Sequence, residues 1–252
     1  MAESMCLRMD RSELPSELRD TYEVYELPDG LGYAWLDEAQ FLALPRTSRT
    51  ALVRAQYRWG REQVPSVKAW GSLLGGRHRE QADGFRFVWW PSLLGGIEQQ
   101  TLTDYVEQGR RPSRHDEVPE HCWASARYLL PGARRLAGKF ATGSGPNCFG
   151  TVMAAVGVAG AESVWMQREP FEHWLAESAR PGGRETDPGT VMVWRSRDGM
   201  VQHTAVTIGS GWAVHKPSQG WFDPVKVLSI GGVKSSARTV GHRLQRYTVD
   251  IR

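Results

Sequence analysis

Three residues of this chain have the types and the order that a thiol-dependent acyl hydrolase requires. Cys148 ends the glycine-rich stretch Gly143–Cys148, and His203 and His215 come later in the chain. A thiolate can attack an amide or ester carbonyl, one imidazole can take and return the proton, and a second can fix the tautomer of the first. The pattern predicts cysteine-based acyl chemistry and does not identify the substrate.

Cys148 is predicted to lie at the start of a helix. The apolar run over residues 149–156 is typical of a buried helix, whereas the glycines and Pro146 before it cannot sustain one. Unpaired N–H groups and the helix dipole at such a position can lower a thiol pKa from about 8.5 to roughly 3.5–7.5, and can hold an oxyanion. The alternative for an isolated cysteine is a small buried residue without a chemical role.

The two histidines are predicted to lie on the two strands of one hairpin. Residues 201–208 are rich in β-branched side chains, which predicts a strand, and Gly209–Gly211 predicts a turn. Residues 212–215 are then the antiparallel partner strand. Alternation places His203 on one face with Ala205 and Thr207, and these small neighbours leave room for the imidazole to approach a helix packed on that face. We expect the two rings to lie near each other, with His203 as the general base and His215 orienting it.

These segments resemble the NlpC-like cysteine peptidases and amidases of the papain superfamily over about residues 139–227. Gly143–Cys148 is similar to the family's approach to the nucleophile. Asp187–Trp194 is similar to the family's Pro-Gly-Asp-Leu-type entry to a strand, and His203–Gly209 to its His-Val-Gly-Ile-Tyr-type strand. Val214–Lys216 is similar to the segment that carries the family's third polar residue. His215 lies 12 residues after His203, as in the family pattern. The resemblance implies that Cys148 is the nucleophile, His203 the base and His215 the orienting group.

The chain departs from the family pattern around the nucleophile. It reads Asn147-Cys148-Phe149-Gly150 where the family usually has Asp-Cys-Ser-Gly, and Phe140 stands where an upstream tyrosine is often found. A tyrosine hydroxyl that could polarise a substrate carbonyl is therefore missing, and Phe149 makes the entrance more apolar. These differences argue against the usual cell-wall peptide as substrate, and the order of cysteine before histidine argues against the permuted acyltransferase relatives. Substrate contacts are expected from Phe149, Asn147, Phe140, Gln202 and Trp212, and the sequence leaves open whether His215 or Gln202 completes the site.

The predicted fold is α+β in two parts. Residues 116–252 are expected to form a papain-like, NlpC-type domain in which the nucleophile helix packs on an antiparallel sheet, and residues 1–115 an N-terminal α+β extension or cap. The expected strands are 191–195, 201–208, 211–215, 225–230 and 244–251. A helix is expected over 169–179, with Phe171, Trp174 and Leu175 facing inward.

The N-terminal part is predicted to contain a hairpin of 22–27 with 31–36 and helices from Asp37 and over 47–64. The second helix would carry Arg54, Arg58 and Arg61 on one face. This face could bind an acidic carrier protein or a nucleic acid, or could simply be solvated. A net charge of only +3 and the lack of a nucleic-acid motif argue against nucleic acid. The similar segments Trp70–Gly76 and Trp90–Gly96 predict matching turns.

Three cysteines at irregular spacing, Cys6, Cys122 and Cys148, predict neither a disulfide framework nor a metal site, and no cofactor is expected. The sequence shows no secretory or membrane-spanning segment, so we expect a cytoplasmic protein that does not bind a membrane. The expected substrate is a peptide or an amide-containing small molecule. Two alternatives stay open: an acyltransferase or amide-forming enzyme in metabolite biosynthesis, and an inactive binding protein with the same fold.

Overall fold

The computed structural model describes residues 3–7, 32–36, 38–58, 65–76, 84–88, 90–94, 112–142, 145–221 and 223–250. The chain divides into two compact units, Met1–Thr101 and Leu102–Arg252. The boundary predicted from the sequence lies between residues 115 and 116.

The described residues of the first unit include an antiparallel strand pair and several helices. Strands β1 (Glu3–Leu7) and β2 (Gly32–Leu36) pair with Glu3 opposite Leu36. The helices are α3 (Glu38–Ala43), α4 (Arg46–Arg58) and α5 (Val67–Trp70). The predicted strand at 31–36 and the two predicted helices are therefore present. Residues 22–27, the expected partner strand, lie outside the described residues, as do Arg61 and the side chain of Arg58, while Arg54 is exposed.

The described parts of the two similar tryptophan-containing segments have matching conformations, while Gly95 and Gly96 lie outside the described residues. Each contains one 3₁₀ helix, η2 (Gly71–Leu74) and η4 (Pro91–Leu94). Trp90, which is 1% exposed, packs against Phe41 with ring centroids 5.7 Å apart. The repeated sequence therefore reflects a repeated local conformation.

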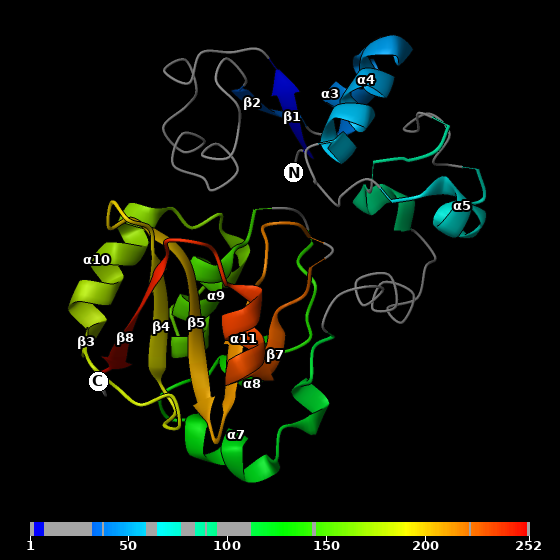
Figure 1. Cartoon of the computed structure of the whole chain (residues 1–252). Coiled ribbons are helices and arrows are strands. Elements are labelled where there is room, and N and C mark those ends of the chain that lie inside the picture. The colour runs from blue at the N-terminus through cyan, green and yellow to red at the C-terminus, as the bar shows by residue number, and fades with distance from the viewer. Residues whose placement is uncertain are drawn as a thin grey trace. The chain divides into compact units, whose positions relative to one another are not determined.

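The second unit is built on a six-stranded antiparallel sheet (Figure 1). The strands have the order β3-β8-β4-β5-β6-β7 across it. Their bounds are β3 (Ala179–Pro181), β4 (Thr190–Arg195), β5 (Val201–Gly209), β6 (Trp212–His215), β7 (Lys226–Ser229) and β8 (Arg243–Val249). The fold of this unit is thus α+β, and each of the five predicted strands is present. The short edge strand β3 was not predicted.

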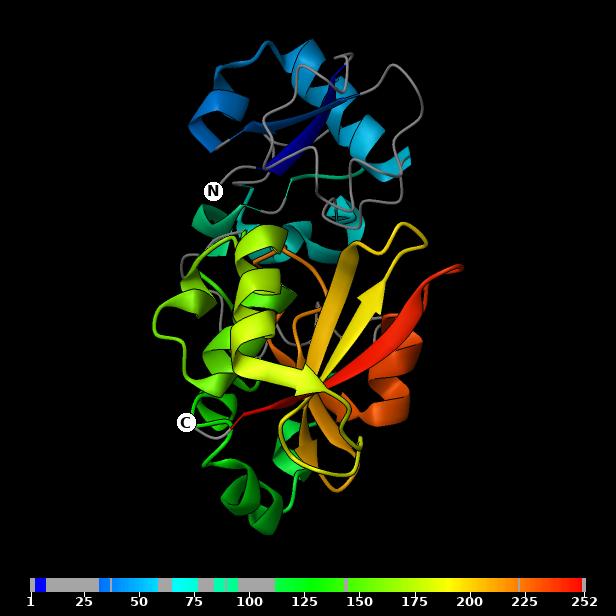
Figure 2. The ribbon, with the colours of Figure 1, turned by 90° about the vertical axis from the view of Figure 1, so that its left-hand side faces the viewer.

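Helices cover both faces of this sheet, and Figure 2 shows α10 (Arg168–Ser178) and α11 (Ile230–Ser236) on opposite sides of it. α9 (Cys148–Val156) lies on the α10 side, because its buried residues form one core with Val191, Val206 and Val214 of the sheet. On the other side, α11 packs against the alternate residues of the same strands, which are Met192, Trp194, Ala205, Ala213 and Leu228. The prediction that the nucleophile helix packs on an antiparallel sheet is confirmed.

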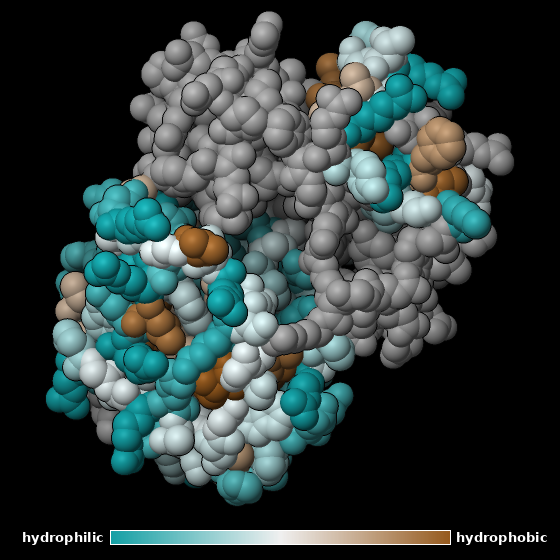
Figure 3. All heavy atoms as spheres, in the orientation of Figure 1, coloured by the Kyte–Doolittle hydropathy of each residue, from teal (hydrophilic) through white to brown (hydrophobic). Residues whose placement is uncertain are grey.

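The remaining helices of this unit lie on either side of α9 in the chain. They are η5 (His115–Glu117), α7 (Glu120–Ala126), α8 (Ala133–Leu136) and η6 (Ala161–Ser163). The predicted inward residues of α10, namely Phe171, Trp174 and Leu175, are all buried. On the face seen in Figure 3, the coloured surface of residues 112–250 is mostly hydrophilic, with apolar side chains in small groups. In the described part of the chain, no helix has the length and apolar character needed to cross a bilayer.

Candidate active site around Cys148

Cys148 is the first residue of α9, and Asn147 caps the helix. The backbone of Asn147 is extended, its Oδ1 accepts a hydrogen bond from the N–H of Gly150 at 3.1 Å, and its Nδ2 donates to the carbonyl of Met166 at 2.7 Å. The cap fixes where the helix begins, and hence where the thiol stands. The prediction that Asn147 contacts substrate is not supported by its geometry, because both ends of its amide already serve the fold and the residue is 5% exposed.

The Cys148 thiol is buried and surrounded by backbone N–H groups. The residue is 7% exposed, and the backbone N–H groups of Thr204, Phe149 and Cys148 itself act to stabilise the thiolate. Burial raises the pKa of the thiol to about 12, even though these N–H groups and the charge of Lys216 act to lower it. The expectation of a lowered thiol pKa is therefore wrong for this state, because loss of water outweighs the helix N-terminus.

His203 and His215 form a hydrogen-bonded pair. His203 Nε2 lies 3.1 Å from His215 Nδ1, and the two rings meet edge to face with their centroids 5.4 Å apart. Burial lowers the pKa of His203 to about 4, with a smaller contribution from the charge of His242. Burial also lowers the pKa of His215 well below its usual range, and the charges of His203, Lys226 and Lys216 act in the same direction. Both rings are therefore neutral near neutral pH, and in the bond between them the N–H of one ring donates to the unprotonated nitrogen of the other.

The buried Nε2 of His215 has no hydrogen-bond partner among the described residues. The residue as a whole is 0% exposed. Buried polar atoms are rarely left unpaired, since an unmade hydrogen bond costs roughly 1–3 kcal/mol. The Nε2 atom is thus a hydrogen-bonding position available to a ligand or to a side chain that moves.

The thiol of Cys148 and the imidazole of His203 lie on different sides of the sheet. His203 lies opposite Trp194 on β4, with ring centroids 5.5 Å apart, and therefore shares the α11 side with Ala205. α9 covers the other side, so the expectation that the nucleophile helix packs on the His203 face is wrong. Sγ instead meets β5 at the backbone N–H of Thr204. Within the described chain, no hydrogen bond joins Cys148 Sγ to either imidazole.

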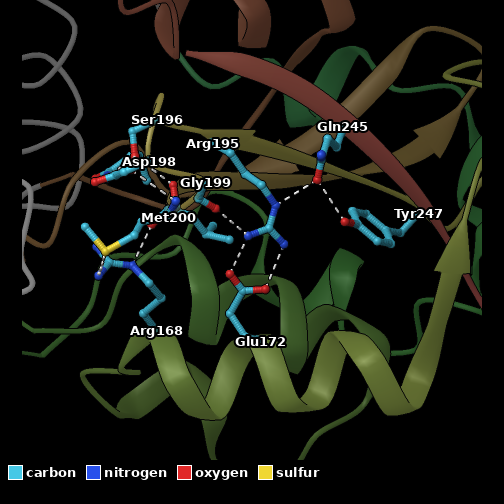
Figure 4. Close-up of polar contacts among 11 residues, drawn as sticks. Arg168, Glu172, Arg195, Ser196, Asp198, Gly199, Met200, Gln245 and Tyr247 are labelled. Carbon is cyan, nitrogen blue, oxygen red and sulfur yellow. Dashed lines mark hydrogen bonds and ion pairs between the residues drawn. The ribbon is translucent and has the colours of Figure 1, made fainter. Parts of the chain in front are cut away.

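A β-bulge and a polar network hold the start of β5. The register of β4 and β5 shifts between Trp194 and Arg195, where Gln202 is the extra residue, and bulges commonly redirect the next side chain. Arg195 binds Glu172 of α10 through two hydrogen bonds of 2.5 and 2.7 Å and donates to Gln245 at 2.7 Å (Figure 4). Arg168 donates to the Val201 carbonyl at 2.9 Å. These contacts fix the strand immediately before His203.

The other predicted substrate contacts lie in different surroundings. Phe149 is 8% exposed and stacks on Phe171 at 4.8 Å, so it belongs to the core and not to an entrance. Trp212 lies under the guanidinium of Arg114 at 4.9 Å, at the opposite end of β6 from His215. Phe140 is partly buried before the nucleophile. Gln202 is also partly buried; its Nε2 donates to Ser196 Oγ at 3.0 Å, and its Oε1 is a buried oxygen without a partner in the described chain.

Lys216, beside His215, is a buried residue of this region for which the sequence predicted no role. It is 2% exposed, and its charge acts on the pKa of both Cys148 and His215. The sequence signal that could have indicated a buried lysine is its position at the end of a predicted apolar strand, directly before Pro217.

Comparison with known proteins gives no match, whether against family models, curated proteins or solved structures. The described residues also contain no group of three histidine, cysteine or acidic side chains arranged to hold a metal ion. The function of the site must therefore be argued from its own residues.

Proposed function

We propose that this chain is a cysteine-dependent amide or peptide hydrolase of the papain-like, NlpC type, acting through a thioester on Cys148. The observation that carries the proposal is the placement of a helix-start thiol near backbone N–H groups and next to β5, whose His203 is hydrogen-bonded to His215 of β6. N–H groups at such a position can stabilise the oxyanion of a tetrahedral intermediate.

The proposed reaction starts from a neutral thiol and a neutral imidazole. Sγ of Cys148 attacks the substrate carbonyl while His203 takes the thiol proton, and the developing oxyanion is held by backbone N–H groups. The imidazolium returns the proton to the leaving amine, and a thioester remains. Water then attacks the thioester while His203 takes a proton from it, the C–S bond breaks to release the acid, and the imidazolium returns the proton to Sγ of Cys148.

This reaction requires the imidazole of His203, which lies on the α11 side of the sheet, to reach Sγ of Cys148 on the α9 side when substrate binds. A general base must come within about 2.6–3.2 Å of the atom it deprotonates, or act through one water, and such contacts often tighten only when substrate binds. The bond from His203 Nε2 to His215 leaves Nδ1 of His203 as the nitrogen for this task. His215 would fix the ring and its tautomer, as the triad logic requires.

Two alternative functions make different use of the thiol. An amine or alcohol in place of water would make the protein an acyltransferase or an amide-forming enzyme, and the buried setting of Cys148 favours such transfer by excluding water. An inactive binding protein of the same fold is favoured by the raised thiol pKa and by the absence, in the described chain, of a bond between thiol and imidazole.

Turnover of a panel of amide, peptide and ester substrates tests the proposal, with and without added amine acceptors. We expect hydrolysis by the wild type and by Cys122→Ala, which changes the other buried cysteine of the described chain, and none by Cys148→Ala. Product formed only with an amine present would favour the transferase. Equal rates in Cys148→Ala and the wild type would exclude Cys148 chemistry.

A further inference from the structure

The ammonium of Lys216 is enclosed by the loop directly after it. Its Nζ donates to the carbonyl oxygens of Ser218, Gly220 and Asp223, each at 2.8 Å. An ammonium has three protons to donate, so this arrangement uses all of them. The backbone of Ser218, Gly220 and Asp223 thereby surrounds one buried cation.

The loop around Lys216 also contains a buried carboxylate. Asp223 is 1% exposed, and its Oδ2 accepts a hydrogen bond from Ser218 Oγ at 2.5 Å. Ser218 Oγ in turn accepts from the N–H of Gly220 at 3.1 Å. The Asp223 charge acts to keep Lys216 protonated, which balances part of the cost of burying an ammonium.

The same loop lies against the segment that leads to the nucleophile. The N–H of Gly145 donates to the Gln219 carbonyl at 2.9 Å. Val225, just after the loop, bonds through its N–H to the Lys139 carbonyl at 2.9 Å and through its carbonyl to the N–H of Gly138 at 2.8 Å. The position of the approach to Cys148 therefore depends on the conformation of the loop around Lys216.

The charged groups that act on Lys216 come from three elements. Burial lowers its pKa to about 8, the charges of Asp223 and Cys148 raise it, and that of Lys226 on β7 lowers it. The interaction with Cys148 is mutual, since the Lys216 charge also favours the thiolate. His215 and His203 supply no such charge near neutral pH, because both are neutral there.

We propose that Lys216 is a positioning residue of the Cys148 site, whose ammonium holds the loop after it against the approach to the nucleophile. The inference deepens the proposed function and rests on it for the role of Cys148.

The test compares Lys216→Met with the wild type and with Lys234→Met, a half-exposed lysine of α11 that pairs with Glu185. Two measurements need no substrate: hydrogen exchange of peptides covering residues 217–223, and the rate of Cys148 alkylation by iodoacetamide as a function of pH. A thiol pKa one unit higher lowers the thiolate fraction tenfold. In Lys216→Met we therefore expect alkylation about tenfold slower near pH 7, and a difference that vanishes above about pH 8 as wild-type Lys216 loses its proton. The protection of the loop's amides against hydrogen exchange should fall at least tenfold. Lys234→Met should match the wild type in both measurements.

A ratio of alkylation rates that does not change with pH, or unchanged protection of the loop against hydrogen exchange, would overturn the proposal. Should Lys216→Met fail to fold, the wild type alone decides. Its log rate of alkylation should rise with pH at a slope below one around pH 8, and a constant slope of one would count against Lys216. Because alkylation needs no turnover, an inactive Cys148 would refute the proposed function and leave this result standing.

Discussion

Acid should destabilise this protein through the histidine pair. The pKa of His203 falls from 6.5 to about 4 because the folded chain buries the ring. Between these values the unfolded chain binds a proton that the folded chain does not, so the free energy of unfolding decreases as the pH falls through this window. One pKa unit corresponds to about 1.36 kcal/mol, which gives a loss of up to about 3 kcal/mol by pH 4. The ring is partly exposed, so this figure is an upper bound.

Urea unfolding at intervals between about pH 7 and pH 4 measures this loss. His203→Asn removes the titrating ring, so its stability relative to the wild type should improve by as much as about 3 kcal/mol on going to pH 4. His173→Asn is the matched control, because His173 is 73% exposed on α10 and should leave the wild-type profile almost unchanged. If the wild type and His203→Asn lose stability in parallel, the burial of a neutral His203 is refuted.

Three further substitutions test the placement of α9. Asn147→Ala removes the helix cap and should lower the free energy of unfolding by about 1–2 kcal/mol in urea, whereas Asn147→Asp keeps the acceptor and should lose less. Gly150→Ala would place a Cβ against the carbonyl oxygen of Ala161 and should cost about 1–3 kcal/mol, while Gly231→Ala, where the added Cβ meets nothing within 4 Å, should be close to neutral by the same measurement. Phe149→Ala should cost about 3–5 kcal/mol if the ring belongs to the core, and a loss below about 1 kcal/mol would instead return Phe149 to the substrate side.

Local sequence patterns predicted the elements that carry the site. The apolar run after Cys148 is α9, and the β-branched segment and glycine turn around residues 209–211 are the hairpin of β5 and β6. Antiparallel pairing across such a turn places His203 and His215 within reach of each other, and their 3.1 Å contact confirms that inference. Periodicity is sufficient here because each signal is local.

The features that the sequence did not predict depend on long-range packing. α11 begins Ile230-Gly-Gly-Val233, which is a poor helix sequence, yet it forms because Ser229 caps it and Val233 is buried against the sheet. The thiol pKa could not be predicted from a helix start, because its sign is set by burial beneath the rest of the unit. The β-bulge at Gln202 likewise depends on pairing between two strands. The enclosure of Lys216 depends on the path of the loop that follows it.

The most direct test of the central claim is single-turnover acylation of Cys148 by an activated ester, with the adduct located by mass spectrometry in the wild type and in His203→Asn. A neutral thiol assisted by a neutral base predicts an acyl group on Cys148, a rate that falls only as the pH approaches 4, and a rate about 10²–10⁴-fold lower in His203→Asn near neutral pH. Equal acylation rates in the two proteins, or an adduct on Cys122 alone, would contradict the assignment of Cys148 and His203 as nucleophile and base.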